Sequence, residues 1–223
     1  MFSVIFETCP RGAEWETYLG LAKSLRPELE QVDGFIDNIR YRSLTREGWL
    51  LSLSNWRDEK ALVRWRTAAH HHAVQEKGRG GVLADYHLRV GQITRDTAPP
   101  KGCAISEQRL DETQTGDGTT AMLIDARRDK DWVAFIHPEE IIAAFGVRLD
   151  TEGLLRWDVF DAVLAPGEII ALLTWRDVAS AQLFAADARL PDGARLRTVR
   201  IVRDYGMFDR REAPQYYPDV KRP

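Results

Sequence analysis

The sequence contains few cysteines, and the two that it has lie far apart. Cys9 and Cys103 are the only thiols among 223 residues, and neither forms part of a C-x-x-C pair. This spacing excludes a disulfide framework and a cysteine-based zinc site. Two isolated thiols are typical of a protein kept in a reducing compartment, so we expect a cytoplasmic location.

The sequence also lacks an excess of charge and a long apolar run. Lys and Arg number 31 against 34 Asp and Glu, giving a formal net charge of -3. There is therefore no basic surplus for binding nucleic acid or an anionic membrane surface. No apolar run approaches the ~18 residues of a membrane span, and the N-terminus has no signal-peptide pattern. We expect neither nucleic acid nor a membrane as a partner.

What the sequence does contain is an internal repeat. The matched segments, each pair separated by 119 positions, are Gly34 with Gly153, Gly48 with Gly167, Trp56-Arg57-Asp58 with Trp175-Arg176-Asp177, and Val4-Ile5 with Leu123-Ile124. A constant separation across turn glycines and a three-residue identity indicates a duplication. The later pair Ile93-x-Arg95-Asp96 and Ile201-x-Arg203-Asp204 is separated by only 108 positions. The second copy is therefore shorter by about 11 residues after its Trp-Arg-Asp motif.

Periodicity predicts the order β-α-β-β-α-β in each copy. The expected elements of the first copy are strands at 2–6, 35–43, 49–55 and 86–90, with helices beginning near Trp15 and after Asp58. Those of the second copy are strands at 121–126, 154–164, 169–175 and 196–205, with helices at 138–145 and 179–188. Strand segments alternate apolar and polar residues, whereas helical segments repeat apolar residues every three to four positions. The order is the split βαβ motif.

The predicted fold class is α+β, with two ferredoxin-like βαββαβ units in one chain. The expected domains are residues 1–96 and 119–223, the second degenerate and carrying the C-terminal tail, joined by a linker at 97–118 with turn-forming composition. A four-stranded sheet with helices on one face leaves its other face bare. Two such sheets can cover each other, so we expect an intramolecular α+β barrel.

The first copy resembles a known family. The segments that carry the resemblance are Trp56-Arg57-Asp58-Glu59-Lys60-Ala61, Trp65-Arg66, His71, Gln75, Gly78-Arg79, Tyr86 and Arg89-Val90, with the tail from Arg203 to Pro214. In this order they resemble a bacterial antibiotic biosynthesis monooxygenase (ABM) domain, well over residues 1–96 and weakly in the second copy. The resemblance implies a dimeric α+β barrel, which this fused chain would form by itself, and the fused chain could pair again as a homodimer. It also implies a small-molecule ligand.

The family includes cofactor-independent oxygenases of phenolic or anthrone-like compounds, heme-degrading enzymes and members without an assigned role. Oxygenation without a cofactor needs a dry aromatic pocket, a base with a pKa of about 7 and hydrogen-bond donors. Trp65 is the candidate for the pocket wall and for a hydrogen-bond donor through its indole N–H. His71 or His72 is the candidate base. The family pattern favours His71. Helical geometry favours His72, which lies ~700° from Trp65 while His71 is turned ~100° away, so both stay open.

Further candidate contacts lie on the first two predicted strands. Asn38 and Tyr41 on the second strand are candidate polar and aromatic substrate contacts. Glu7 stands where the heme-degrading branch of the family has an Asn, and a carboxylate there would repel heme propionates. The resemblance therefore favours no cofactor, with heme as the alternative.

Three functional hypotheses follow for this pocket. The first is a cofactor-independent monooxygenase acting on a small aromatic or polyketide-like compound. The second is a binding or accessory protein without turnover, and the third is a heme-degrading monooxygenase. At the separation of 119, Trp65 falls on Phe184, His71 on Leu190 and His72 on Pro191. We therefore expect any chemistry to belong to the first copy.

Overall fold

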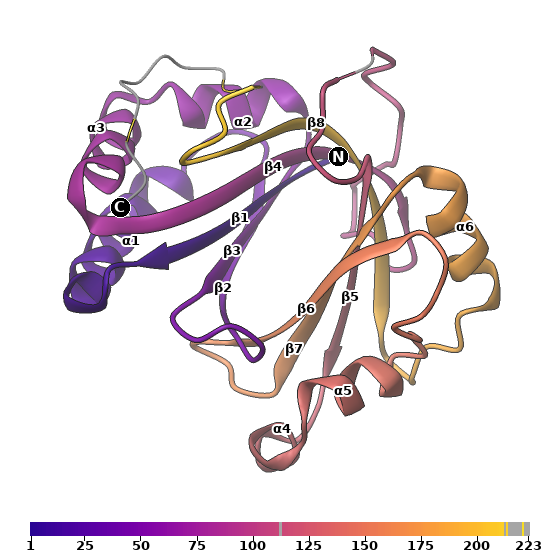
Figure 1. The fold of residues 1–223 in the computed structure, drawn as a ribbon. Helices are drawn as coiled ribbons and strands as arrows, with labels where there is room; N and C mark the ends of the chain where they lie inside the picture. Colours follow the sequence, from indigo (N-terminus) through magenta and orange to yellow (C-terminus); the bar gives the residue numbers. More distant parts are fainter. Residues whose placement is uncertain (112, 212, 214–219, 221–223) are drawn as a thin grey trace.

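Alternating strand residues in both copies build one closed antiparallel barrel. The computed structural model describes residues 1–111, 113–211, 213 and 220. Within them, eight strands follow each other around the barrel in the order β1-β3-β2-β6-β7-β5-β8-β4. In Figure 1 the helices of the two copies lie on opposite sides of these strands. The predicted α+β barrel formed within one chain is confirmed.

The first half contains the helices that cover the future site. Its elements are β1 (Phe2–Pro10), α1 (Trp15–Leu29), β2 (Phe35–Ser43), β3 (Leu50–Trp56), α2 (Glu59–Arg66), α3 (Ala69–Lys77), a π-turn (Gly78–Val82) and β4 (Leu83–Asp96). A short 3-10 turn (Gly12–Glu14) precedes α1.

The second half has a lighter helical layer. Its elements are β5 (Thr120–Arg127), α4 (Lys130–Phe135), α5 (Pro138–Ala144), β6 (Leu154–Ala162), β7 (Glu168–Trp175), α6 (Val178–Asp187) and β8 (Arg195–Gly206). The sequence pattern missed α4, which begins after the N-cap Asp129, whose side chain accepts hydrogen bonds from two backbone amides. After α6 the chain enters β8 without counterparts of α3 and the π-turn.

The halves join at two antiparallel seams. One is long and pairs β4 with β8, from His87↔Gly206 to Asp96↔Arg197. The other is short and pairs β2 with β6 at three positions. At the long seam a Cβ on Gly91 would lie 2.2 Å from Val199 Cγ1, so only glycine allows the strands to approach this closely.

The repeated Trp-Arg-Asp motif has the same structural role in both halves. Trp56 and Trp175 are fully buried at the ends of β3 and β7. The following aspartates cap α2 and α6, because each accepts a backbone N–H at 2.8 Å. This explains why both copies carry the motif.

The equivalence of the first strands differs from the sequence match by one residue. Phe2 pairs with Trp56, whereas Thr120 pairs with Trp175. The two strands therefore correspond at a separation of 118, and the match of Val4-Ile5 with Leu123-Ile124 is wrong. A one-residue shift moves every side chain to the other face of the sheet, so the distinction matters for which residues face the helices.

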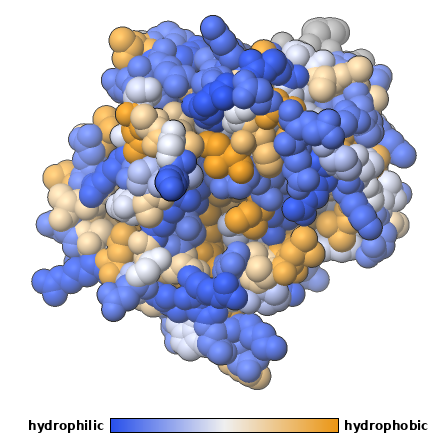
Figure 2. All heavy atoms as spheres, turned by 180° about the vertical axis from the view of Figure 1, so that it is seen from behind, coloured by the Kyte–Doolittle hydropathy of each residue, from blue (hydrophilic) through white to orange (hydrophobic). Residues whose placement is uncertain are grey.

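Apolar side chains fill both the barrel interior and the layers outside it. The interior cluster includes Ile5, Leu53, Leu123, Phe160 and Leu172, all nearly inaccessible to solvent. The face seen in Figure 2 is mostly hydrophilic, with separate hydrophobic patches near its middle. Among the described residues, no helix is both long enough and apolar enough to cross a membrane.

Candidate active site

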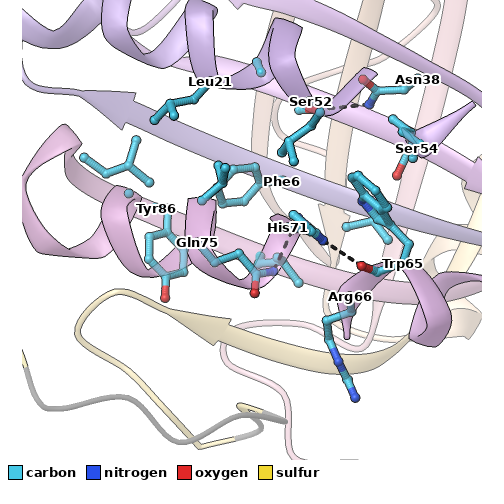
Figure 3. A pocket seen from close by; sticks show the side chains of 18 of the residues that line it. Phe6, Leu21, Asn38, Ser52, Ser54, Trp65, Arg66, His71, Gln75 and Tyr86 are labelled. Atoms are coloured by element: carbon cyan, nitrogen blue, oxygen red, sulfur yellow. Dashed lines mark hydrogen bonds between the residues drawn. The ribbon is translucent and has the colours of Figure 1, made fainter. Parts of the chain in front are cut away.

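A cavity of about 210 Å³ lies between the sheet and the helices of the first half. Its floor is the outer face of β1, β2, β3 and β4, and its roof comes from α1, α2, α3 and the π-turn. Figure 3 shows this arrangement. The labelled side chains of the floor are Phe6, Asn38, Ser52, Ser54 and Tyr86, and those of the roof are Leu21, Trp65, Arg66, His71 and Gln75.

The floor consists of two parallel rows of side chains that cross the strands. Strand pairing gives the rows as Arg40, Ser52, Phe6, Leu88 and Asn38, Ser54, Val4, Val90. Each row is polar on β2 and β3 and apolar on β1 and β4. A bound molecule would therefore meet polar groups at one side of the floor and a hydrocarbon surface at the other.

The roof places a histidine against an indole. The rings of Trp65 and His71 stack with centroids 4.4 Å apart and planes 16° from parallel. Nδ1 of His71 lies 3.0 Å from the backbone oxygen of Trp65. A carbonyl oxygen can only accept, so Nδ1 donates its proton and Nε2 carries the free lone pair. Nε2 lies 3.5 Å from the Gln75 side-chain nitrogen.

Burial determines the protonation of His71. It lowers the pKa of the ring from 6.5 to about 4, although the bond to the Trp65 carbonyl favours the charged form. The imidazole is therefore neutral at pH 7, with its basic nitrogen identified. Such a group can accept a proton when a negative charge develops beside it, because the new anion stabilises the imidazolium.

Comparison with known proteins identifies the family. Residues 1–77 match the family model described as antibiotic biosynthesis monooxygenase. A protein of Pyricularia oryzae named Jasmonate monooxygenase ABM is 49% identical over 226 residues, which cover 98% of this chain and 99% of the relative. The chain belongs to the antibiotic biosynthesis monooxygenase family. The predicted resemblance is thereby confirmed.

Solved structures of other proteins share parts of this fold. A crystal structure of an aldoxime dehydratase covers 90% of this chain and 80% of its own, with a TM-score of 0.54 and 11% identity. At this identity the likeness concerns the fold alone. A conserved protein from Methanosarcina mazei Go1 is 20% identical and covers 40% of this chain and 88% of its own, with a TM-score of 0.37.

The structure separates the two candidate histidines of this ABM chain. His71 lines the cavity, whereas His72 is exposed. Extrapolating one helix from Trp65 favoured His72, but the helix is interrupted: α2 ends at Arg66 and Ala68 is extended. The interruption resets the helical phase, so the angle derived from a continuous helix is wrong here. Catalysis by His71 stays a prediction.

The other predicted contacts divide between two environments. Asn38 lines the cavity, and its amide donates to Ser52 Oγ at 3.1 Å. Tyr41 and Glu7 are not brought to the cavity. Tyr41 packs in the interior cluster of the barrel, and Glu7 accepts from Arg89 inside the barrel at 2.6 Å. Neighbouring strand residues point to opposite faces, so Phe6 reaches the cavity and Glu7 does not.

Glu7 belongs to a buried ionic network at one mouth of the barrel. Burial alone would raise its pKa, but Arg89, His87 and Arg46 outweigh burial and lower it. Each of the two arginines lies 2.6 Å from one oxygen of the carboxylate. The carboxylate is therefore held by cations on both oxygens, and it lines a second pocket at this mouth of the barrel rather than the cavity beneath the helices.

Several residues that line the cavity were not predicted from the sequence. Arg40 has the same parity as Asn38 on β2, so alternation would have placed it on the same face. Tyr18 recurs with Trp15 and Ala22 at helical spacing, so the pattern predicts packing in the core for it rather than a role in the cavity. Tyr205 and Arg210 come from the end of the second half, and no pattern in the first copy could have indicated them.

The cavity does not fit a heme. Its volume of about 210 Å³ suits a small compound and is too small for a porphyrin. The Asn position of the heme-degrading branch holds Glu7, which points into the barrel. The residues present therefore do not support a heme-degrading reaction.

Proposed function

We propose that this chain is a cofactor-independent monooxygenase that oxidises a small, mainly apolar compound, with His71 as the base. The observation that carries the proposal is the neutral, hydrogen-bond-oriented imidazole inside an apolar cavity. A general base must be unprotonated at working pH and close to the substrate proton, and it works best when its pKa lies near that pH. His71 satisfies the first condition, and its place in the cavity wall supports the second. Its pKa of about 4 has to rise when the substrate anion forms beside it.

Two substrate types are worth testing. The first is a small phenol or anthrone of polyketide type, which loses a proton to form a delocalised anion. The second is jasmonate, a cyclic keto acid, because the relative that is 49% identical carries that name. An anthrone and jasmonate each have a carbonyl group that acidifies a neighbouring methylene C–H bond, whereas a simple phenol loses its O–H proton. All are small and largely apolar.

The reaction can balance without an added reductant. His71 Nε2 removes a proton from a substrate methylene, and the carbanion transfers one electron to O2. The resulting radical pair combines to form a C–O bond, and the peroxide takes the proton back from His71. Loss of water from the hydroperoxide breaks the O–O bond and the second C–H bond. The methylene becomes a carbonyl, one oxygen atom enters the product, and the other leaves as water.

The decisive experiment combines oxygen uptake with isotope labelling. Purified protein is mixed with each substrate type under ¹⁸O2, without NAD(P)H, flavin or metal. We expect one labelled oxygen atom per product molecule. His71→Gln should lower the rate by about 10²- to 10⁴-fold, the usual contribution of a general base. His72→Gln is the matched control on the next residue and should keep the rate.

Other results would contradict the proposal in distinguishable ways. A requirement for an external reductant would overturn the cofactor-free reaction. Tight substrate binding without oxygen uptake would favour the non-catalytic binding protein instead. An unchanged rate in His71→Gln would remove His71 from the mechanism.

A further inference from the structure

The charges around the cavity are strongly unequal. Among the described residues that line it are Arg40, Arg66, Arg79 and Arg210, and no Asp or Glu lines it. Arg79 and Arg210 donate to the Tyr86 hydroxyl, whereas Arg40 has no carboxylate partner among the described residues. A cation that faces a low-dielectric space in this way attracts an anionic ligand. An apolar cavity with positive charge at its wall is suited to an apolar molecule that carries one negative group.

Arg40 is the cation whose surroundings are most informative. It lies on β2 at the polar side of the floor, next to Ser52 of β3. Its Nε is buried and has no hydrogen-bond partner in the part of the chain that the structure describes. In the described part of the chain, no carboxylate lies within ion-pair distance of Arg40, whereas Arg42 on the same strand pairs with Asp161 at 3.2 Å.

Arg46, in the turn that follows β2, makes the contrast stronger. It lies 2.6 Å from carboxylate oxygens of both Glu7 and Asp158. The sequence thus supplies acidic partners to the two neighbouring arginines of this hairpin and leaves Arg40 to face the cavity. Arg40 is half-buried, and its Nε is buried without a hydrogen-bond partner among the described residues. A buried, unpaired donor of a cationic group is costly, and an incoming anion would remove that cost.

Tyr18 of α1 provides a second donor at the same place. Its hydroxyl is buried beside the Arg40 guanidinium, and burial raises the pKa of Tyr18. The hydroxyl therefore stays protonated and can donate. A planar guanidinium and a phenol O–H together match the two oxygens of a carboxylate, and charge-assisted bonds of this kind are the stronger ones.

We infer that the substrate is an organic acid, and that Arg40 together with Tyr18 binds its carboxylate at the polar side of the floor. The apolar body then lies along the row that continues through Phe6 to Leu88, beneath the helices that carry His71. This inference rests on the proposed function, because it names the substrate class of the same cavity. It makes Arg40 a determinant of specificity.

Binding without oxygen tests this inference separately from catalysis. Jasmonate and methyl jasmonate share the apolar body and differ in the negative charge. We expect anaerobic calorimetric titration to show acid binding at least tenfold tighter than ester binding. Arg40→Gln should weaken acid binding by about ten- to hundredfold and leave ester binding unchanged. Arg40→Lys should restore part of the acid affinity.

Controls keep the result interpretable. Arg42→Gln removes an arginine on the same strand that already has a carboxylate partner, and it should leave acid binding unchanged. Thermal unfolding of Arg40→Gln should show an intact fold. Equal loss of acid and ester affinity in Arg40→Gln, or equal affinity of the wild type for both, would overturn the inference.

The two proposals fail independently. Acid binding through Arg40 without oxygen uptake would keep the carboxylate site and overturn the oxygenase. Oxygen uptake with a neutral phenol, without binding of the acid, would keep the oxygenase and overturn the carboxylate site.

Discussion

The two halves of the barrel use the same strand order and the same capping motif, but they differ in the space beneath their helices. In the first half, Trp65 stacks on His71 beside a cavity. In the second half, Phe184 takes the position of Trp65 and packs on Trp175, with ring centroids 5.3 Å apart. The second half has no counterpart of α3 between α6 and β8, so no residue takes the position of His71. Leu190, which follows α6 and which the constant separation matched to His71, packs against the same apolar cluster.

The strands that form the floor of the cavity in the first half also carry more apolar residues in the second half. The four polar positions on β2 and β3 have apolar counterparts on β6 and β7: Asn38, Arg40, Ser52 and Ser54 correspond to Trp157, Val159, Ala171 and Leu173, all of which belong to or pack against the second-half core. Replacing Ser54 by Leu173 also removes a hydrogen-bond acceptor. Trp56 Nε1 donates to Ser54 Oγ at 3.0 Å, whereas Trp175 Nε1 is buried without a partner.

The comparison teaches that the shared backbone does not by itself make a site. Both halves keep the caps and the buried tryptophans that fold the unit. Only the first half has polar groups on the floor, a base in the roof and the extra helical residues that hold it. The second half completes the barrel and contributes Tyr205 and Arg210 to the rim of the cavity.

The largest expected loss of stability concerns the well-packed second half. Phe184→Ala should lower the free energy of unfolding by about 3–5 kcal/mol, because it empties a well-filled core. Urea denaturation measures this loss. Leu183→Ala is the adjacent control: Leu183 is 73% exposed, so its removal should change stability by less than about 0.5 kcal/mol. A small loss for Phe184→Ala would mean that the second half is loosely packed as well.

In the first half, we expect the free energy of unfolding to depend on pH through His71, with an effect of similar size. Because burial lowers the pKa of His71 from 6.5 to about 4, only the unfolded chain binds this proton between those values. The contribution of His71 is fully present above pH 6.5 and is lost as pH falls towards 4. It amounts to at most about 3 kcal/mol. His71→Gln should flatten the stability profile in this window relative to the wild type, and His72→Gln should not.

An exchange of the two aromatic residues should give a smaller, asymmetric effect. Phe184→Trp adds volume to a filled core and should cost about 1–3 kcal/mol. Trp65→Phe replaces an indole that borders a cavity and should cost less than about 1.5 kcal/mol. Unfolding curves of both variants test the asymmetry. Equal costs would show that the space near Trp65 is not available to a ligand.

The smallest effect should be the same in both halves. Asp58→Ala and Asp177→Ala each remove one N-cap hydrogen bond of 2.8 Å. Each should lower stability by about 1 kcal/mol. Asn at either position should restore most of the loss. Unequal costs would mean that the capping motif has a further role in one half.

Most of the fold could be predicted from the sequence because the patterns that indicate it are local. Turn glycines, strand alternation and the aspartate caps each depend on a few neighbouring residues, and they recur at a fixed separation. The site was less readable. The structure brings Trp65, His71 and Asn38 together at the cavity, and their roles stay predictions. The choice between His71 and His72 depended on the interruption at Thr67 and Ala68.

The sequence by itself determined the duplication, the strand order and the closure of one barrel from two incomplete sheets. Each sheet exposes an apolar face that only the other copy can cover. The tertiary structure decided which charges meet. It placed Glu7 among arginines inside the barrel and brought Tyr205 and Arg210 from the second half to the cavity. It also left Arg40 facing that cavity without a carboxylate partner among the described residues. Such pairings depend on which strands become neighbours across the barrel, and no local pattern encodes them.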